Sequence, residues 1–235
     1  MSQTLKFGNG TWATKKGSTL AHNDEGGNFK PLPFTTTRST SATRVNKEGL
    51  IEVVSNEVPR IDYTDSEDGV FLLEKASTNL FPYSEDFENS DWTKNSGTTI
   101  TNNYAISPDG TLNASRYLGT GASGLGDKFT LSATSYTLSF YVKSNTSENQ
   151  FCRLIGDSSN ISENLLITTE WTRLSYTFTG SGLSNKTNGI FRDSSDNDID
   201  VLIYGAMLEQ NSVASSYIPT QGTIQTRVQE TASGS

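Results

Sequence analysis

The stretch SYTLSFYVKS (135–144) alternates between apolar and polar side chains over its whole length. Successive side chains of a β-strand point to opposite faces, so this pattern predicts a strand with one buried face. The apolar face carries Tyr136, Leu138, Phe140 and Val142, and the polar face carries Thr137, Ser139, Tyr141 and Lys143. The stretch RLSYTFTG (173–180) repeats the pattern with Phe178 on its apolar side. We therefore expect Phe140 and Phe178 to be buried, and alanine in place of Thr137 or Thr177 to have little effect on stability.

Further short strands separated by turns are expected between residues 79 and 220. The clearest candidates are TTITNNYAI (98–106), QFCRLIG (150–156), ENLLITTE (163–170) and IDVLIYGAMLE (199–209). A tight turn is predicted at Ser107–Gly110. The sequence shows neither a convincing helical period nor a repeat of fixed length. Together these features predict an all-β fold, an antiparallel β-sandwich of the jelly-roll type.

The first 78 residues have a different character. Proline-containing extended pieces such as FKPLPF (29–34) alternate with short strands such as VFLLE (70–74), and little apolar material remains for a separate core. We predict that residues 1–78 form an extended, β-rich attachment or assembly region that needs a partner to cover it. Residues 79–220 then form the jelly roll, and residues 221–235 form a polar, loosely held C-terminal tail.

The charge and the termini argue against two classes of partner. The formal net charge is −8. Sequence-independent binding of nucleic acid needs a basic surface for the phosphates, so this charge disfavours it. No segment approaches the roughly 20 apolar residues of a membrane helix, and the N-terminus lacks the apolar core of a signal peptide. We expect a protein that is made in a cytoplasm, binds no nucleic acid and does not insert into a membrane.

The residues that usually carry catalysis are scarce. Cys152 is the only cysteine and lies in a strand-like stretch, which indicates a buried, inert thiol. His22 is the only histidine and lies in the turn-like stretch AHNDEGGN, so neither a His-assisted nucleophile nor a zinc cluster is expected. A glycosidase would need two carboxylates that face each other across a cleft. With 26 acidic residues such pairs arise by chance, and we expect no enzymatic activity.

Calcium is the one metal that the sequence suggests, as a structural ion. It takes oxygen ligands from carboxylates and backbone carbonyls. Two acidic stretches could supply them, SEDFENSD (84–91) and DSSDND (193–198). The candidate ligands are Glu85, Asp86, Asp193, Asp196 and Asp198. The alternative is that both stretches are solvated acidic turns, because neither has the glycine and distal glutamate of an EF-hand loop.

Exposed aromatic rings are the candidates for carbohydrate binding, because they stack on the faces of sugar rings. Trp92, Tyr104, Tyr117 and Tyr141 are the four that we consider. Packing in the core is the alternative for each of them, since aromatic side chains dominate core energetics.

Several segments, taken in order, resemble a family of bacteriophage virion proteins. These proteins have an N-terminal block followed by a jelly roll like that of carbohydrate-binding modules. The segments are Thr43–Val45, Gly49–Glu52, Pro59–Tyr63, Leu72–Glu74, Thr78–Leu80, Tyr83–Phe87, Trp92–Lys94, Ser107–Thr111, Gly205–Ala206, Leu208–Glu209, Ser216–Thr220 and Thr226–Arg227. The resemblance covers about residues 35 to 230. Relatives often carry Trp-Gly-Ala-Gln where this chain has Tyr204–Met207, so it assigns no sugar-stacking role to that site.

The resemblance implies a non-enzymatic structural protein on the surface of a virion, in a tail fibre, a tailspike or a capsid decoration. It implies that the chain forms a homo-oligomer, contacts other virion proteins and binds polysaccharide on the host surface. It also implies that the jelly roll could hold calcium. The alternative is a carbohydrate-binding module of a polysaccharide-degrading enzyme or depolymerase. Labelling of virus particles by an antibody against the chain would separate these two settings.

Overall fold

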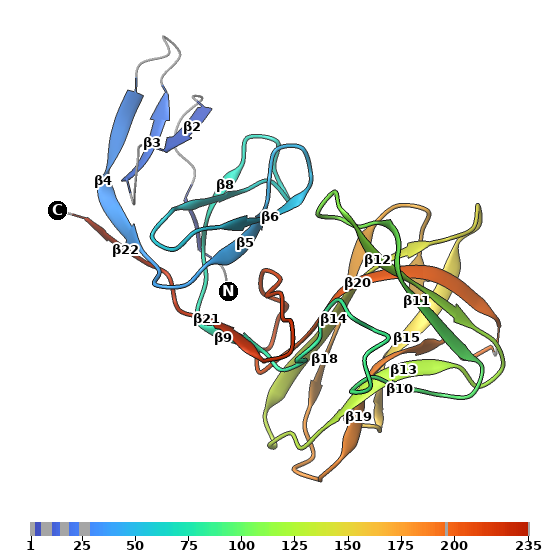
Figure 1. The fold of residues 1–235 in the computed structure, drawn as a ribbon. Helices are drawn as coiled ribbons and strands as arrows, with labels where there is room; N and C mark the ends of the chain where they lie inside the picture. Colours follow the sequence, from blue (N-terminus) through green and yellow to red (C-terminus); the bar gives the residue numbers. More distant parts are fainter. Residues whose placement is uncertain (1–2, 6–10, 15–18, 24–28, 196, 235) are drawn as a thin grey trace. The chain divides into compact units, whose positions relative to one another are not determined.

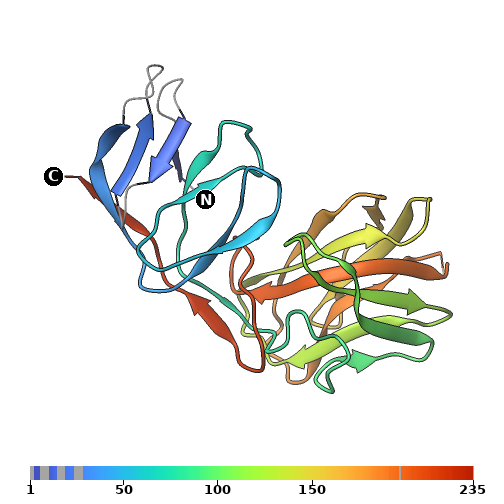
Figure 2. The same cartoon turned by 45° about the horizontal axis from the view of Figure 1, so that its top comes forward.

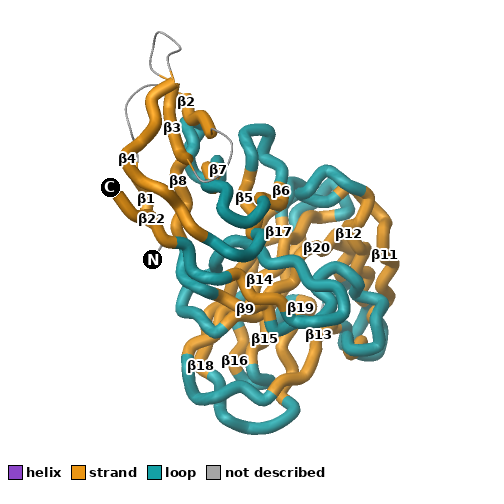
Figure 3. Tube along the Cα trace, turned by 60° about the vertical axis from the view of Figure 1, so that its left-hand side comes forward, coloured by secondary structure: helices purple, strands orange, loops and turns teal. Residues whose placement is uncertain are grey.

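The computed structural model describes residues 3–5, 11–14, 19–23, 29–195 and 197–234. Every regular element in these ranges is a β-strand, as Figure 3 shows by its colours. Within them, therefore, no helix is long and apolar enough to cross a membrane. The chain divides into two compact units (Figure 1). Unit 1 comprises residues 1–77, 215–218 and 226–235, and the jelly-roll unit comprises residues 78–214 and 219–225.

The jelly-roll unit contains two antiparallel sheets. Its strands are β10 (Thr93–Lys94), β11 (Thr98–Ile106), β12 (Leu112–Gly119), β13 (Gly124–Phe129), β14 (Ser135–Ser144), β15 (Gln150–Gly156), β16 (Asn160–Ile161), β17 (Leu165–Ile167), β18 (Thr172–Thr179), β19 (Lys186–Arg192) and β20 (Ile199–Glu209). One sheet has the order β11-β12-β20-β14-β18. The other has the order β10-β13-β19-β15-β16, and β17 pairs with β15. The long strand β20 is orange in Figure 2.

The strand pairing defines the jelly roll. Strands β12, β13, β14 and β15 pair in turn with β20, β19, β18 and β17. These four pairs follow one another along the chain as one long antiparallel double-stranded ribbon, with β12–β15 in one arm and β17–β20 in the other. Folding the ribbon over adds the pairs β14–β20 and β15–β19, which close the two sheets. The predicted all-β, antiparallel jelly-roll sandwich is therefore confirmed.

The core between the two sheets contains the rings predicted from the alternating strands. Phe140 is fully buried and Phe178 is 6% exposed. Cys152 is also buried in this core, and burial raises the pKa of its thiol to about 12, so the predicted inert thiol is confirmed.

The expectation for Thr137 is wrong. Its side chain is 1% exposed, although it lies on the opposite face of β14 from Phe140. Its hydroxyl donates to the carbonyl of Asn211 and lies 2.9 Å from the Thr177 hydroxyl. The segment that follows β20 thus covers this part of the sheet. Alanine here would remove the hydrogen bond to the half-buried carbonyl of Asn211, and a lost hydrogen bond costs about 0.5–1.5 kcal/mol.

Unit 1 is built from short strands. They are β1 (Gln3–Leu5), β2 (Thr11–Thr14), β3 (Thr19–Asn23), β4 (Phe29–Thr37), β5 (Ala42–Val45), β6 (Ile51–Val54), β7 (Arg60–Asp62), β8 (Val70–Leu73) and β22 (Thr231–Gly234). They form the sheets β1-β8-β7 and β2-β3-β4-β22 and the hairpin β5-β6, while β9 (Ser77–Asn79) pairs with β21 (Gln225–Arg227). His22 lies in strand β3, not in a turn, and residues 24–28 of the turn-like stretch lie outside the described residues.

The two prolines of FKPLPF lie in the part of β4 that has a neighbouring strand on one side. Strand β22 pairs with β4 only from Phe34 to Thr37. Pro31 and Pro33 precede that stretch, where the described part of β4 pairs with β3 alone. Proline has no backbone N–H to donate to a neighbouring strand, so it is tolerated where that side of the strand has no neighbour.

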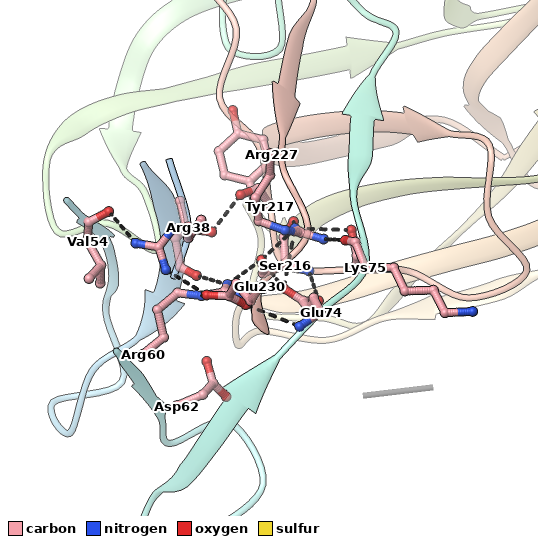
Figure 4. Close-up of polar contacts among 12 residues, drawn as sticks. Arg38, Val54, Arg60, Asp62, Glu74, Lys75, Ser216, Tyr217, Arg227 and Glu230 are labelled. Atoms are coloured by element: carbon pink, nitrogen blue, oxygen red, sulfur yellow. Dashed lines mark hydrogen bonds and ion pairs between the residues drawn. The ribbon is translucent and has the colours of Figure 1, made fainter. Parts of the chain in front are cut away.

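Buried charges contribute much of the interior of unit 1 (Figure 4). One apolar cluster among its described residues comprises the buried Ile61 and Phe71, with Tyr63 and Leu73 packed against them, and Ile51 and Val54 are buried as well. Nearby, three arginines and two glutamates form a connected set. These residues, named here the ion cluster, are Arg38, Arg60, Glu74, Arg227 and Glu230.

Glu230 is at the centre of the ion cluster. Its Oε1 accepts hydrogen bonds from Arg38 Nη1 at 2.6 Å and from Arg60 Nε at 2.8 Å. Its Oε2 accepts from Arg60 Nη2 and from the backbone N–H of Glu74. Arg227 Nη2 donates to the carbonyl of Lys75 at 2.9 Å. The two buried C-terminal residues, Glu230 and Arg227, therefore bind residues far earlier in the chain.

The C-terminal segment is thus not a loosely held tail. Arg227 is 1% exposed and Glu230 is 7% exposed, and β22 pairs with β4. The reason is electrostatic: buried guanidinium groups need carboxylate partners, and part of that requirement is supplied from the chain's end.

Acid should destabilise unit 1 through Glu74. Burial alone would raise the pKa of Glu74, but Arg227, Arg60 and hydrogen bonds from Ser216 outweigh burial and lower this pKa. A carboxyl group whose pKa falls on folding stabilises the fold fully above its unfolded pKa, about 4.3, and this contribution is lost as the pH falls through the folded value.

We therefore expect protection of unit 1 amides against hydrogen exchange to fall below about pH 4, after correction for the intrinsic exchange rate. The variant Glu74→Gln should show a weaker dependence on pH than the parent chain. Protection that stays constant or rises on acidification would contradict this role of Glu74.

Candidate functional site

A pocket of about 570 Å³ opens on the jelly-roll unit. This volume is in the range of small-molecule sites. The residues that line it are Tyr83, Glu85, Asp86, Asn102, Asn103, Asn113, Thr220 and Gln221. They come from the loop after β9, from β11 and β12, and from the segment after β20. Nearly all can donate or accept hydrogen bonds through their side chains, and the set includes no lysine, arginine or histidine.

The loop after β9 is held by its own hydrogen bonds and by the core. The backbone N–H of Ser84 donates to Thr220 Oγ1 at 3.0 Å, and the backbone N–H of Thr220 donates to Ser84 Oγ at 2.9 Å. Tyr83 and Gln221 form a bridge beside this pair. Trp92 Nε1 donates to the carbonyl of Tyr83 at 2.8 Å. The wall formed by Tyr83, Thr220 and Gln221 is therefore fixed to the core.

An irregularity in β11 directs two asparagines toward the pocket. The register between β11 and β12 shifts between Thr101 and Ala105. Asn103, inside this shift, has φ of 53°, a left-handed conformation that asparagine tolerates better than most residues. Asn102 Nδ2 donates to Asp86 Oδ1 at 2.6 Å, and Ser115 Oγ donates to Asn102 Oδ1 at 2.7 Å. The irregularity thus connects the strand to the acidic wall.

Behind the pocket, one tyrosine hydroxyl lies between two carboxylates. Tyr204 Oη is 3.2 Å from Glu85 Oε1 and 3.1 Å from Asp109 Oδ2. Burial and these two negative groups raise the pKa of Tyr204, so the hydroxyl stays protonated. A hydroxyl carries a single hydrogen and can donate it to one carboxylate at a time.

Asp109 is held in its charged form. Burial would raise its pKa, but hydrogen bonds from Thr111, Asn113 and Ser107 outweigh burial and lower the pKa of Asp109. Asn113 donates through Nδ2 to Asp109 Oδ2 at 2.9 Å. The other side-chain atom of this asparagine, Oδ1, is buried and has no hydrogen-bond partner among the described residues.

Two of the four predicted sugar-binding rings are core residues, and those two predictions are wrong. Trp92 is 2% exposed, and its ring centroid is 4.6 Å from that of Phe81 and 5.1 Å from that of Phe87. Tyr117 is fully buried, its hydroxyl donates to Ser123 Oγ, and burial raises its pKa to about 12. Aromatic rings on strands and at strand entries pack where they bury most area.

The other two rings are accessible, and each has an arginine over it. Tyr104 is 45% exposed, with the guanidinium carbon of Arg116 5.3 Å from its ring centroid. Tyr141 is half-buried, with the guanidinium carbon of Arg173 also at 5.3 Å. Neither ring lines the pocket, so their role in carbohydrate binding stays a prediction.

The predicted calcium ligands fall at separate places. Glu85 and Asp86 line the pocket. Asp193 accepts hydrogen bonds from Asn197 and Ser195, which lower its pKa although burial opposes this, and Asp198 is exposed. Asp196 lies outside the described residues. Across the described ranges, no three histidine, cysteine, aspartate or glutamate side chains are grouped to hold a metal. Calcium binding stays a prediction.

Most of the pocket was not predicted from the sequence. Asn102 and Asn103 were considered only as parts of a strand, Asn113 was not considered, and Thr220 and Gln221 lie far from them in sequence. One signal was available: two adjacent asparagines interrupt the alternation of TTITNNYAI, and asparagine is typical of positions with positive φ.

No family model and no curated protein matches this chain. Among solved structures, it is similar to the CBM22-1 xylan-binding domain of Paenibacillus barcinonensis Xyn10C, with 14% identity, coverage of 58% of this chain and 94% of that one, and a TM-score of 0.42. It is also similar to the CBM22-1 and GH10 modules of Clostridium thermocellum xylanase 10B, complexed with xylohexaose. There the identity is 17%, the coverage 56% of this chain and 27% of that one, and the TM-score 0.41.

A third similar structure is the enzymatically active domain of tailspike protein 4 from bacteriophage CBA120. The identity is 13%, the coverage 56% of this chain and 21% of that one, and the TM-score 0.36. The similar structures thus include carbohydrate-binding modules and a phage tailspike.

Proposed function

We propose that the jelly-roll unit is a carbohydrate-binding module that holds a saccharide in the pocket lined by Tyr83, Glu85, Asp86 and the three asparagines, and that it does not cleave its ligand. The observation that carries this proposal is the lining itself. Amide, carboxylate and hydroxyl groups line a pocket of about 570 Å³ beside strands β11 and β12. A saccharide presents a dense set of hydroxyl groups, which such a lining satisfies with hydrogen bonds.

Binding without cleavage is supported by the arrangement of the carboxylates. A glycosidase places one carboxyl group on each side of the bond that it cleaves. Glu85 and Asp86 are adjacent in sequence and belong to the same wall, while Asp109 does not line the pocket. Release of reducing sugar from any polysaccharide by the purified chain would contradict this part of the proposal.

The setting in which the module works is a further part of the proposal. An accessory module of a polysaccharide-acting enzyme and a surface component of a phage particle both need a binding unit of this kind. The segments between residues 35 and 230 that resemble bacteriophage virion proteins, and that follow one another in the same order, favour the phage particle. There the chain would form a homo-oligomer and contact other virion proteins. Antibody labelling confined to infected-cell lysate and absent from particles would exclude that setting.

A glycine substitution tests the pocket directly. Asn103→Gly removes a lining side chain while its positive φ suits glycine, and Gln221→Ala removes a second exposed one. Each lost hydrogen bond is worth about 0.5–1.5 kcal/mol, so the double variant should bind an array-identified glycan about tenfold more weakly.

The matched control for this test is Asn185→Gly. Asn185 also has a positive φ, of 56°, is exposed, and lies outside the pocket lining. It should bind as the parent chain does. Equal affinity of the control and the pocket variant would place the binding site elsewhere, and absence of binding to every polysaccharide would overturn the proposed function.

A further inference from the structure

The ammonium group of Lys94 is held by the loop that precedes it. Its Nζ donates hydrogen bonds to the carbonyls of Glu88, Asn89 and Trp92, at 3.2, 3.1 and 3.1 Å. An ammonium group has three hydrogens and no acceptor, so these three bonds use its whole donor capacity. The loop of residues 88–92 therefore curves around one positive charge.

Successive turns give the loop this shape. The backbone N–H of Asn89 donates to the carbonyl of Asp86, and that of Trp92 donates to the carbonyl of Asn89. Asn89 Oδ1 accepts from the backbone N–H of Asp91 at 3.1 Å, a turn that asparagine side chains commonly make. Phe87 and Trp92 are buried in the core and fix the two ends of the loop. Three carbonyl oxygens are thereby directed toward the same point.

Two carboxylates of the same loop face this charge and also hold the pocket. Burial lowers the pKa of Lys94, although the negative charges of Asp86 and Glu88 oppose this. Asp86 Oδ1 accepts from Asn102 Nδ2 at 2.6 Å, and Glu88 Oε1 accepts from the backbone N–H of Asn102 at 3.1 Å. Asn102 and Asn103 are neighbours in the lining of the pocket. Lys94 is thus connected to the pocket through both carboxylates.

The groups around this ammonium are those that calcium prefers. Calcium takes carbonyl and carboxylate oxygens as ligands. The carbonyls that the loop directs inward are already bound to Lys94 Nζ, and a second cation beside the ammonium would be repelled by it. The loop therefore does not fit a calcium ion, although its carboxylates suggest one.

We propose that Lys94 takes the place of a structural calcium ion in residues 84–92, and that it is a positioning residue for the pocket. Its charge holds the loop, and the carboxylates of the loop hold Asn102 and, with it, Asn103. The positioning role rests on the proposed function, because it concerns the same pocket. The replacement of calcium does not.

Thermal melts of the full chain test the replacement of calcium. Lys94→Met removes the charge and keeps an unbranched side chain, so with a chelator present it should melt roughly 4 °C below the parent chain. Calcium should raise the melting temperature of Lys94→Met more than that of the parent, because the three carbonyls are then open to the ion. Lys128→Met, at an exposed position of β13, is the control and should respond as the parent does.

Hydrogen exchange and saccharide affinity test the positioning role. In Lys94→Met with a chelator, protection should fall in peptides from residues 98–106, which contain Asn102 and Asn103. The same variant should bind the glycan selected on an array about three- to tenfold more weakly, and calcium should restore part of both losses. Lys128→Met should match the parent in both measurements.

The possible outcomes separate the two proposals. Equal melting of Lys94→Met and Lys128→Met, or equal calcium responses of Lys94→Met and the parent, overturns the replacement of calcium. So does a calcium response of the parent that Asp86→Asn with Glu88→Gln removes. Unchanged exchange in residues 98–106 or unchanged affinity of Lys94→Met overturns the positioning role. Failure of the parent to bind every saccharide overturns the proposed function and leaves the melting results for Lys94 standing.

Discussion

Replacement of Glu230 by alanine should unfold unit 1 and leave the jelly-roll unit folded. Glu230 is 7% exposed, and its carboxylate accepts hydrogen bonds from Arg38 and Arg60. Arg38 is 3% exposed and Arg60 is fully buried. Without Glu230, two buried guanidinium groups lose a partner that few other groups could replace. Removing one side of a buried ion pair costs about 3–5 kcal/mol, a large part of the roughly 5–15 kcal/mol that stabilises a domain.

The matched control is another arginine–glutamate pair of the same unit. Arg44 and Glu52 form an ion pair whose side chains are 25% and 37% exposed. Exposed ion pairs contribute about 0–1 kcal/mol to stability, so Glu52→Ala should change the stability of unit 1 very little. Glu230→Gln keeps a hydrogen-bond acceptor, so its loss of stability should lie between those of Glu230→Ala and Glu52→Ala.

Hydrogen exchange measured peptide by peptide separates the two units. In Glu230→Ala, protection should be lost in peptides from residues 42–73 and kept in peptides from residues 135–144. Equal stability of Glu230→Ala and Glu52→Ala would show that the ion cluster is not essential to unit 1.

Replacement of Phe140 by alanine should cost the jelly-roll unit about 3–5 kcal/mol, from the lost transfer energy and the cavity that remains. Phe140 is fully buried, and its ring centroid lies between 6.2 and 6.3 Å from those of Phe81, Phe87 and Trp92. A cavity at this position would loosen the aromatic cluster that also anchors Tyr83 through Trp92. The variant should therefore lose saccharide affinity as well as stability.

Phe151→Ala is the control for this substitution. Phe151 lies on β15 of the same unit, and it is 45% exposed. The same chemical change there should alter stability by about 0.5 kcal/mol or less. Denaturant unfolding followed by tryptophan fluorescence, to which Trp12, Trp92 and Trp171 all contribute, measures both variants. Similar losses for the two phenylalanines would mean that β14 does not present Phe140 to the core.

The sequence predicts strands and burial well in some parts of this protein and poorly in others. The alternation in residues 135–144 and 173–180 correctly predicted strands β14 and β18 and the burial of Phe140 and Phe178. Strand periodicity is a local property, readable wherever one face of a strand is buried. The same alternation failed for Thr137, because the segment around Asn211 covers the polar face there, and no local pattern records such a cover.

The candidate site was predicted only in part. Glu85 and Asp86 were identified by their chemistry, and both line the pocket. Trp92 and Tyr117 were identified by theirs as well, but the fold buries them. An aromatic residue can fill a core or cover a ligand, and its type alone does not decide between these roles.

What the sequence determined by itself was the β class, the strands of the jelly roll, the inert thiol of Cys152 and the acidic character of the wall at Glu85 and Asp86. Each follows from residues that are neighbours in the chain, or from a residue type. The tertiary structure alone decided the rest. It brought Thr220 and Gln221 beside Tyr83, it placed Asn103 in the irregularity of β11, and it paired Glu230 with Arg38 and Arg60. These contacts join residues that are distant in sequence, and the energies that select them arise only when a folded chain buries charges and polar groups that must find partners.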